Sequence, residues 1–302
     1  MSGQVLFLEC RNGKYAIPAA DDTIGVAMRR YGEWAQAEID LLMPLISPGD
    51  LVIDAGANIG SHTIPFARAV GPQGTVIAFE AQARIASLLS WTVTENGFSS
   101  NVLVLNAVVG SEDAIGSIPV SRRPDLERAN FGAVTFSSIG AGADELQINA
   151  PLRCVTIDGL GLPRCDVIKM DIEGMELAAL RGARRALKAF QPIVYFEFAN
   201  DDRAALDLML QQIGGEYRYF AHYARAFNPN NFKNDQGNIF GPASELNILA
   251  LPPRVATAPA LPQIWSAADL PAKPADEPAP PPALGFRAWL ERARCAIASR
   301  MS

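Results

Sequence analysis

Short apolar runs alternate with amphipathic segments through the middle of the chain. Runs rich in Val, Ile and Leu lie at residues 51–54, 75–79, 101–105, 166–170 and 192–196. Between them, apolar residues recur every three or four positions, which predicts helices over residues 61–70, 83–95, 175–190 and 203–213. Strands separated by helices of this length predict right-handed crossovers and a largely parallel sheet with helices on both faces. The predicted fold class is therefore α/β.

The pattern changes at the two ends of this body. The first forty residues predict a small hairpin, followed by a helix over 33–45, so that residues 1–48 form a cap. Residues 217–223 and 246–251 are joined by an Asn- and Gly-rich loop, which predicts an antiparallel pair at one edge of the sheet. Broken strand signals within residues 110–157, at 133–136, 146–148 and 153–157, indicate an insertion on the substrate side.

The carboxyl-terminal segment differs in composition from the body. Ten prolines lie between Pro252 and Pro282, so we expect residues 252–284 to form a linker or a loosely packed tail. Apolar residues at helical spacing, interleaved with arginines, predict a basic amphipathic helix over 285–302. Two alternatives stay open for this helix: it docks on its own domain, or it contacts a membrane surface or a partner protein.

Composition and charge exclude several classes of protein. The chain has 302 residues, of which 49% are hydrophobic and 19% charged, as in ordinary globular proteins. A formal net charge of −6 predicts that it has no nucleic-acid partner. The four cysteines include no C-x-x-C pair, which argues against a zinc knuckle or a redox dithiol. With no basic leader and no apolar run of about 18 residues, we expect a cytoplasmic protein.

A glycine-containing turn, Asp54-Ala-Gly-Ala-Asn-Ile-Gly60, follows the first apolar run. In open parallel sheets, the first strand-to-helix turn is a common ligand site, and Gly56 and Gly60 allow close backbone approach. Glu80 ends the second run, where a carboxylate accepts hydrogen bonds from the hydroxyls of an adenosine ribose. Because the turn lacks the G-x-G-x-x-G fingerprint, it favours an adenosine ligand without a pyrophosphate.

Carboxylates follow two later strands. Asp171 and Glu173 come after the fourth run, and Glu197 ends the fifth, so these groups are expected to converge at the carboxyl edge. There they suit a general base; a divalent cation held by Asp171 and Glu197 is the less favoured alternative. Glu173, at the start of a predicted helix, is also explained by the helix dipole alone. His222 is a second-rank base candidate, and Lys169, inside an apolar run, requires a carboxylate partner.

Four ordered motifs carry a resemblance to a known family. They are GDLVIDAGANIG at 49–60, IKMDIEGME at 168–176, LRGA at 180–183 and PIVYFE at 192–197. Together they resemble the FkbM-type S-adenosylmethionine-dependent methyltransferases over about residues 30–251, with a methyltransferase domain at 49–251. The resemblance implies a Rossmann-like class I fold of seven strands, the last inserted antiparallel. It also implies methyl transfer to a hydroxyl of a sugar, glycolipid or secondary metabolite.

The resemblance also implies roles for individual residues. By position, Asp54, Gly56, Asn58 and Gly60 bind the methionine end of S-adenosylmethionine, Glu80 binds the ribose, and Asn106 and Ala107 lie near the adenine. Ala81 follows Glu80 where many relatives have proline, and this leaves the carboxylate itself in place. The expected partner is a small-molecule or glycan acceptor. Two alternatives are a cofactor-binding scaffold that recruits a membrane or glycan-assembly partner, and an NAD(P)-dependent oxidoreductase.

Overall fold

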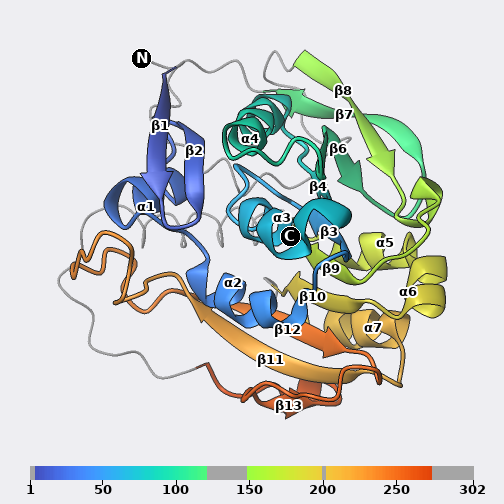
Figure 1. The fold of residues 1–302 in the computed structure, drawn as a ribbon. Coiled ribbons are helices and arrows are strands. Elements are labelled where there is room, and N and C mark those ends of the chain that lie inside the picture. Colours follow the sequence, from blue (N-terminus) through green and yellow to red (C-terminus); the bar gives the residue numbers. More distant parts are fainter. Residues whose placement is uncertain (1–3, 121–147, 199–201, 274–302) are drawn as a thin grey trace.

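A twisted eight-stranded sheet forms the centre of the protein in a computed structural model, which describes residues 4–120, 148–198 and 202–273 (Figure 1). The strand order is β13-β11-β12-β10-β9-β3-β4-β5. The strands are β3 (Leu51–Ala55), β4 (Thr75–Phe79), β5 (Val102–Leu105), β9 (Val167–Met170), β10 (Ile193–Glu197), β11 (Arg218–Arg225), β12 (Ser244–Leu251) and β13 (Gln263–Ile264).

The pairing of the strands confirms the predicted fold class. β5, β4, β3, β9 and β10 are parallel to their neighbours in this group. β12 lies between β10 and β11 and runs antiparallel to both. The fold is therefore a Rossmann-like α/β fold with its last long strand inserted antiparallel, and β13 adds one short strand beyond the expected seven.

Helices cover both faces of the sheet, as Figure 1 shows. The apolar residues of α5 (Glu176–Arg181), α6 (Arg184–Phe190) and α7 (Arg203–Ile213) pack on one face. The other face is covered by α1 (Ile24–Arg30), α2 (Gln36–Leu42), α3 (Thr63–Val70), α4 (Ala83–Glu95) and the hairpin of β1 (Val5–Cys10) and β2 (Gly13–Pro18). Short 3₁₀ turns are η1 (Met43–Leu45), η2 (Gly71–Gln73), η4 (Asp158–Leu160) and η5 (Ala267–Asp269).

The insertion expected at residues 110–157 is described in part. β6 (Ala107–Val109), β7 (Ala114–Val120) and β8 (Ile148–Val155) form a three-stranded sheet in the order β6-β8-β7. The strand signal at 133–136 lies outside the described residues. This small sheet stands beside the carboxyl end of β5, next to the central sheet (Figure 1).

Two predicted helices differ from the structure. The helix expected over 175–190 is broken into α5 and α6 at Gly182, where an added Cβ would overlap the carbonyl oxygen of Gly110. The helix expected over 33–45 is confined to α2 and η1, and the structure adds α1, which the pattern did not predict. In the first case a close backbone contact between distant parts of the chain overrides a continuous apolar pattern.

Part of the segment at 252–273, where we expected a linker or a loosely packed tail, packs against the central sheet. β13 pairs with β11, and Ile264 and Ala267 are buried. The backbone N–H of Ala267 also donates to the Asp207 carboxylate of α7 at 2.7 Å. Apolar residues placed between the prolines thus cover the edge of the sheet. Residues 274–284, and the helix expected over 285–302, lie outside the described residues.

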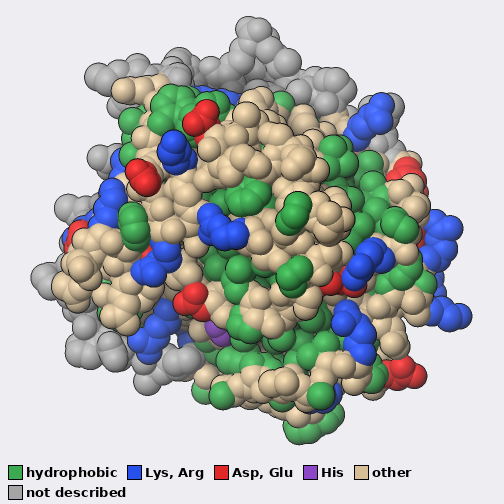
Figure 2. Space-filling view, viewed as in Figure 1, with side chains coloured by type: hydrophobic (Ala, Val, Ile, Leu, Met, Phe, Trp, Pro, Cys, Tyr) green, Lys and Arg blue, Asp and Glu red, His purple; other side chains and the backbone are tan. Residues whose placement is uncertain are grey.

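Charges of both signs are interspersed over the described part of the face in Figure 2. No helix in the described ranges is both long enough and apolar enough to cross a bilayer.

Candidate functional site

The glycine turn after β3 is shaped by packing against its own protein. Gly56 has a φ of +78° and Gly60 a φ of +99°, both in the range that favours glycine. A Cβ on Gly56 would overlap the carbonyl oxygen of Asp171, and one on Gly60 would lie 2.8 Å from Leu89 Cδ1. The sequence suggested room for a ligand at both positions. The structure shows that the turn also needs both glycines to pack against the loop after β9 and against α4.

Burial divides the four turn residues into two pairs. Gly56 and Asn58 are partly exposed, whereas Asp54 and Gly60 are buried. The Asp54 side chain is fully buried: Oδ2 accepts from Thr63 Oγ1 at 2.6 Å, and Oδ1 lies 3.3 Å from Lys169 Nζ. The carboxylate anchors the buried ammonium. The contact with the methionine end of the cofactor that the resemblance implies for Asp54 stays a prediction.

Lys169 has the carboxylate partner that its place in an apolar strand required. Its Nζ lies 3.3 Å from Asp54 Oδ1 and 3.7 Å from Asp171 Oδ2, and it donates to the carbonyl of Gly56 at 3.2 Å. Burial alone would lower the pKa of this ammonium, but the Asp54 and Asp171 carboxylates outweigh burial and raise the pKa above its ordinary value. The charged side chain therefore ties β3, β9 and the glycine turn together.

Glu80 joins the end of β4 to the glycine turn. Its carboxylate accepts from the backbone N–H of Asn58 at 3.0 Å and of Gln82 at 2.8 Å. Burial raises the pKa of Glu80 to about 7, although these two hydrogen bonds act in the opposite direction. Asn106 lies beside it and donates to the carbonyls of Glu80 and Ala81 at 2.8 Å each. Ala107 follows, buried at the start of β6. The residues expected at the ribose and adenine are thus neighbours.

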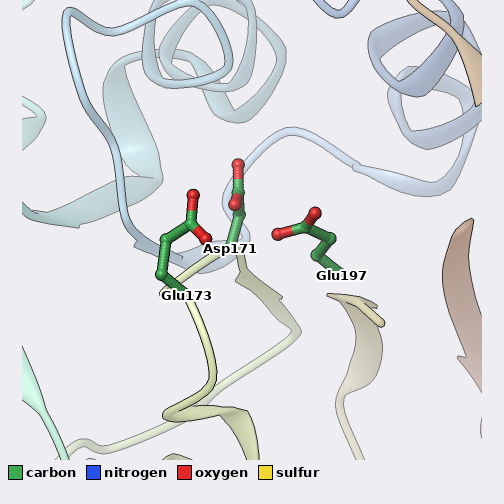
Figure 3. Close-up of side chains that lie close together, drawn as sticks. All are labelled: Asp171, Glu173 and Glu197. Carbon is green, nitrogen blue, oxygen red and sulfur yellow. The ribbon is translucent and has the colours of Figure 1, made fainter. Parts of the chain in front are cut away.

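The three carboxylates expected at the carboxyl edge do converge. Asp171, Glu173 and Glu197 offer oxygens that all lie within 4.8 Å of one another. Figure 3 shows the three side chains gathered at the ends of their strands. Burial, followed by repulsion from Asp171, raises the pKa of Glu173 to about 8 and that of Glu197 well above its usual value. Each side chain is partly exposed, so the cluster opens toward solvent. The arrangement provides a proton acceptor of raised pKa or oxygen ligands for a cation.

Two residues of β12 were missed by the sequence reading. Asn247 stands directly opposite Glu197 of β10 and opposite His222 of β11, so the three side chains share one face of the sheet. Glu245, two residues earlier, lies on the same face. The Asn247 side chain is 2% exposed, and its Nδ2 has no hydrogen-bond partner among the described residues. The alternation of polar and apolar residues at 245–248 was the available signal.

His222 is held by a tyrosine rather than by the carboxylate cluster. Its Nδ1 lies 2.8 Å from the hydroxyl of Tyr195, and burial lowers its pKa, with Glu38 opposing. In the β10-β12-β11 order, Asn247 stands between His222 and Glu197. The other histidine, His62, lies 3.4 Å from a Glu38 oxygen at the start of α3. His222 is therefore separated from the cluster by Asn247, and its use as a base stays a prediction.

The structure is thus a Rossmann-like α/β protein. The glycine turn follows β3, and an acidic cluster follows the neighbouring strands β9 and β10. The chain matches the methyltransferase FkbM domain over residues 54–224. This match spans more than half of the chain, and the chain belongs to the FkbM methyltransferase family.

Individual relatives are more distant. Methyltransferase sdnD of Sordaria araneosa is 30% identical over 156 residues, covering 43% of this chain and 59% of the relative. Hexuronic acid methyltransferase AglP of Haloferax volcanii is 26% identical over 164 residues, covering 53% of this chain and 60% of the relative. The matches thus cover about three fifths of these relatives. A solved FkbM methyltransferase from Methylobacillus flagellatus aligns with a TM-score of 0.40 at 17% identity, covering 70% of this chain and 50% of that one.

Proposed function

We propose that this protein is an S-adenosylmethionine-dependent methyltransferase acting on a hydroxyl oxygen of a sugar, glycolipid or secondary metabolite. The observation that carries the proposal is the bond between the Glu80 carboxylate and the backbone of Asn58, which joins the expected ribose site to the glycine turn. Membership in the FkbM family supports the cofactor, and the open acidic cluster beside it supports proton removal from an acceptor.

The chain's own residues suit distinct parts of the cofactor. The partly exposed backbone of Gly56 and Asn58 would hold the methionine end, and Glu80 would hold the ribose. Asn106 and Ala107 would lie near the adenine, and Asn106 also fixes the loop after Glu80 through its two bonds to backbone carbonyls. Asp54 acts indirectly, by holding Lys169 against the turn.

Methyl transfer to oxygen requires alignment and one proton acceptor. When bound, S-adenosylmethionine would supply the methyl group to the acceptor's oxygen, and the electron pair of the broken carbon–sulfur bond would remain on sulfur as a neutral thioether. The hydroxyl proton would go to a carboxylate oxygen, for which one oxygen of Glu197 is suited because burial and Asp171 raise the pKa of this group well above the usual value, and its other oxygen stays available for a further contact. Asp171 and Glu173 stand next to it, and His222 is the second-rank candidate.

A sugar-like acceptor is supported by one relative, whose name says that it methylates a hexuronic acid. We propose that the loop at 226–243 and the insertion at 110–157 shape the acceptor pocket. The loop is fastened near the site by Glu33, which accepts from Asn228 Nδ2 and from the backbone N–H of Phe232, each at 2.7 Å.

Binding of the cofactor tests the proposal directly. S-adenosylmethionine is expected to raise the melting temperature of the full chain, and Glu80→Ala is expected to lose that shift. Glu95→Ala, which changes an exposed carboxylate on α4, is the matched control and should keep it. No shift with the unaltered chain would overturn the proposal. Incubation with radiolabelled methyl donor and fractionated cell extract then identifies the acceptor class.

The two alternatives give different results in the same assays. An oxidoreductase would be stabilised by NAD(P)H, although the turn lacks the pyrophosphate fingerprint. A scaffold would bind S-adenosylmethionine normally, and its cellular phenotype would survive the combined Asp171→Asn and Glu197→Gln substitutions. Loss of labelled product in this double variant, with cofactor binding retained, supports catalysis instead.

A further inference from the structure

We propose that Asp171, Glu173 and Glu197 bind a hard divalent cation, Mg²⁺ or Mn²⁺, beside the buried carboxamide of Asn247. The inference rests on the proposed function only for the role of the cation, because the site itself is argued from the geometry of these four side chains. In this proposal Glu173 is a ligand of the cation, whereas the sequence alone allowed its presence to be explained by the helix dipole.

The spacing of the carboxylates fits a small cation. Their candidate oxygens lie within 4.8 Å of one another. The three side chains follow the ends of β9 and β10, and those of Glu173 and Glu197 reach toward Asp171 from either side (Figure 3). Oxygen ligands at about 2.1 Å from Mg²⁺ lie at most about 4.2 Å apart. Side-chain adjustments of a few tenths of an ångström on each ligand therefore suffice. The set contains only carboxylate oxygens, which favours Mg²⁺ or Mn²⁺ over zinc.

The local charge balance leaves room for a cation. Lys169 is the one cation linked to the cluster by an ion pair within the described ranges, and it lies closer to Asp54, at 3.3 Å, than to Asp171, at 3.7 Å. Across the same ranges, no Lys or Arg pairs with Glu173 or Glu197. Glu245, on the Asn247 face of β12, adds a further negative charge nearby. Like charges this close repel strongly, and a bound divalent cation relieves that repulsion.

Asn247 provides an independent sign of a ligand at this place. Its side chain is 2% exposed and stands directly opposite Glu197, yet its Nδ2 has no partner among the described residues. A buried donor without an acceptor is costly and uncommon in folded proteins. An oxygen held at the cation, from water or from the acceptor's hydroxyl, would satisfy it. The acidic cluster and the unpartnered amide thus point to the same occupant.

The cation would also fit the proposed chemistry. The Asp171 side chain is 43% exposed, so the ligand set is open on one side and leaves positions for the acceptor. A hydroxyl bound there loses its proton more readily, because the cation stabilises the negative oxygen. Asn247 would then hold the same oxygen in place.

Binding of Mn²⁺ alone to the chelator-treated full chain tests the site. Electron paramagnetic resonance of free Mn²⁺ is expected to show one saturable site, and Glu197→Gln should weaken it by about tenfold or more. Glu95→Gln, on the exposed side of α4, is the matched control and should leave the affinity unchanged. If Glu197→Gln does not fold, Glu173→Gln replaces it, because Glu173 lies in a loop.

Melting temperatures give a second readout, because the difference in stability between Glu197→Gln and the unaltered chain should change sign when Mn²⁺ is added. Without Mn²⁺, Glu197→Gln should melt at a higher temperature than the unaltered chain, because one of the repelling charges is gone. With Mn²⁺, the unaltered chain should gain stability and the variant should not. A loss of stability in the variant under both conditions would indicate a merely structural carboxylate and would overturn the proposal.

The outcomes separate this site from the proposed function. Absence of saturable binding up to about 1 mM Mn²⁺, or equal weakening by Glu95→Gln, overturns the cation site. Stabilisation by S-adenosylmethionine in the presence of chelator is measured on the same samples. If Mn²⁺ binds but the cofactor does not, the methyltransferase proposal fails and the cation site stands.

Discussion

Single buried charges organise the carboxyl edge of the sheet. Lys169 lies between Asp54 and Asp171 and also binds the carbonyl of Gly56, so one ammonium fixes the glycine turn relative to β9. Glu80 performs the corresponding task on the other side of the turn, through the backbone of Asn58. The backbone that would face a cofactor is therefore held from both sides by ionisable groups.

The raised pKa of Glu80 predicts a pH dependence of stability. Because the folded protein holds the proton more tightly than the unfolded chain, the stabilising contribution is complete below pH 4.5 and is lost as the pH rises through about 7. The loss is on the order of 3 kcal/mol over this window. Glu80→Gln should remove this part of the slope when unfolding by urea is measured at several pH values without cofactor. An unchanged slope, equal to that of Glu95→Gln, would contradict the assignment.

At the scale of elements, the glycine turn predicts a difference between two glycines. Gly56→Ala should lower the free energy of unfolding by about 3–4 kcal/mol, from backbone strain of about 1–2 kcal/mol plus overlap with the Asp171 carbonyl. Gly49→Ala has a similar φ of +87° but open space around its Cβ, so only the strain applies. Urea unfolding of the two variants measures the difference. Equal losses would show that the turn does not press against the loop after β9.

The central elements were predictable because burial follows the sequence pattern: β3, β4, β9 and β10 are almost wholly buried, and α4 and α7 are buried along one apolar face. The five parallel strands lie within one residue of the apolar runs, and the helices at 83–95 and 203–213 have the expected bounds. The broken helix at Gly182 was not predictable, since its cause is the backbone of Gly110, distant in sequence. β13 was not predictable for a similar reason. The proline-rich composition of its segment does not reveal that the edge strand β11 offers a surface that Ile264 and Ala267 can cover.

The sequence predicted those site residues whose positions depend only on where the parallel strands end. Asp171 and Glu197 follow apolar runs that end at the same edge, so their convergence followed from the parallel arrangement. The place of Asn247 beside Glu197 could not be predicted, because it depends on the insertion of β12 next to β10 and on the register of that pair. The full burial of Asp54 could not be recognised either, because it depends on Thr63 and Lys169 closing around the carboxylate.

At the scale of the whole molecule, the site and the terminal segment lie at different parts of the sheet. Glu80 ends β4, whereas β13 pairs with β11 at the far edge of the strand order. There, Ile264 and Ala267 are buried, and the hydroxyl of Tyr223 donates to the carbonyl of Pro271 at 3.0 Å. The segment up to residue 273 therefore supports the fold at a distance from the proposed cofactor site.

Two truncations separate these contributions. Removal of residues 262–302 should lower the free energy of unfolding by about 2–5 kcal/mol, because it uncovers the apolar edge packed by β13 and η5. Removal of residues 274–302 leaves β13 and η5 in place and is the matched comparison, so it should lower the free energy of unfolding by less than the longer truncation does. Both shortened chains should bind S-adenosylmethionine with the affinity of the full chain under conditions where they are folded, because β4 and β13 are six places apart in the strand order. Equal destabilisation by the two truncations, measured by urea unfolding, would place the stabilising contacts beyond residue 273 instead.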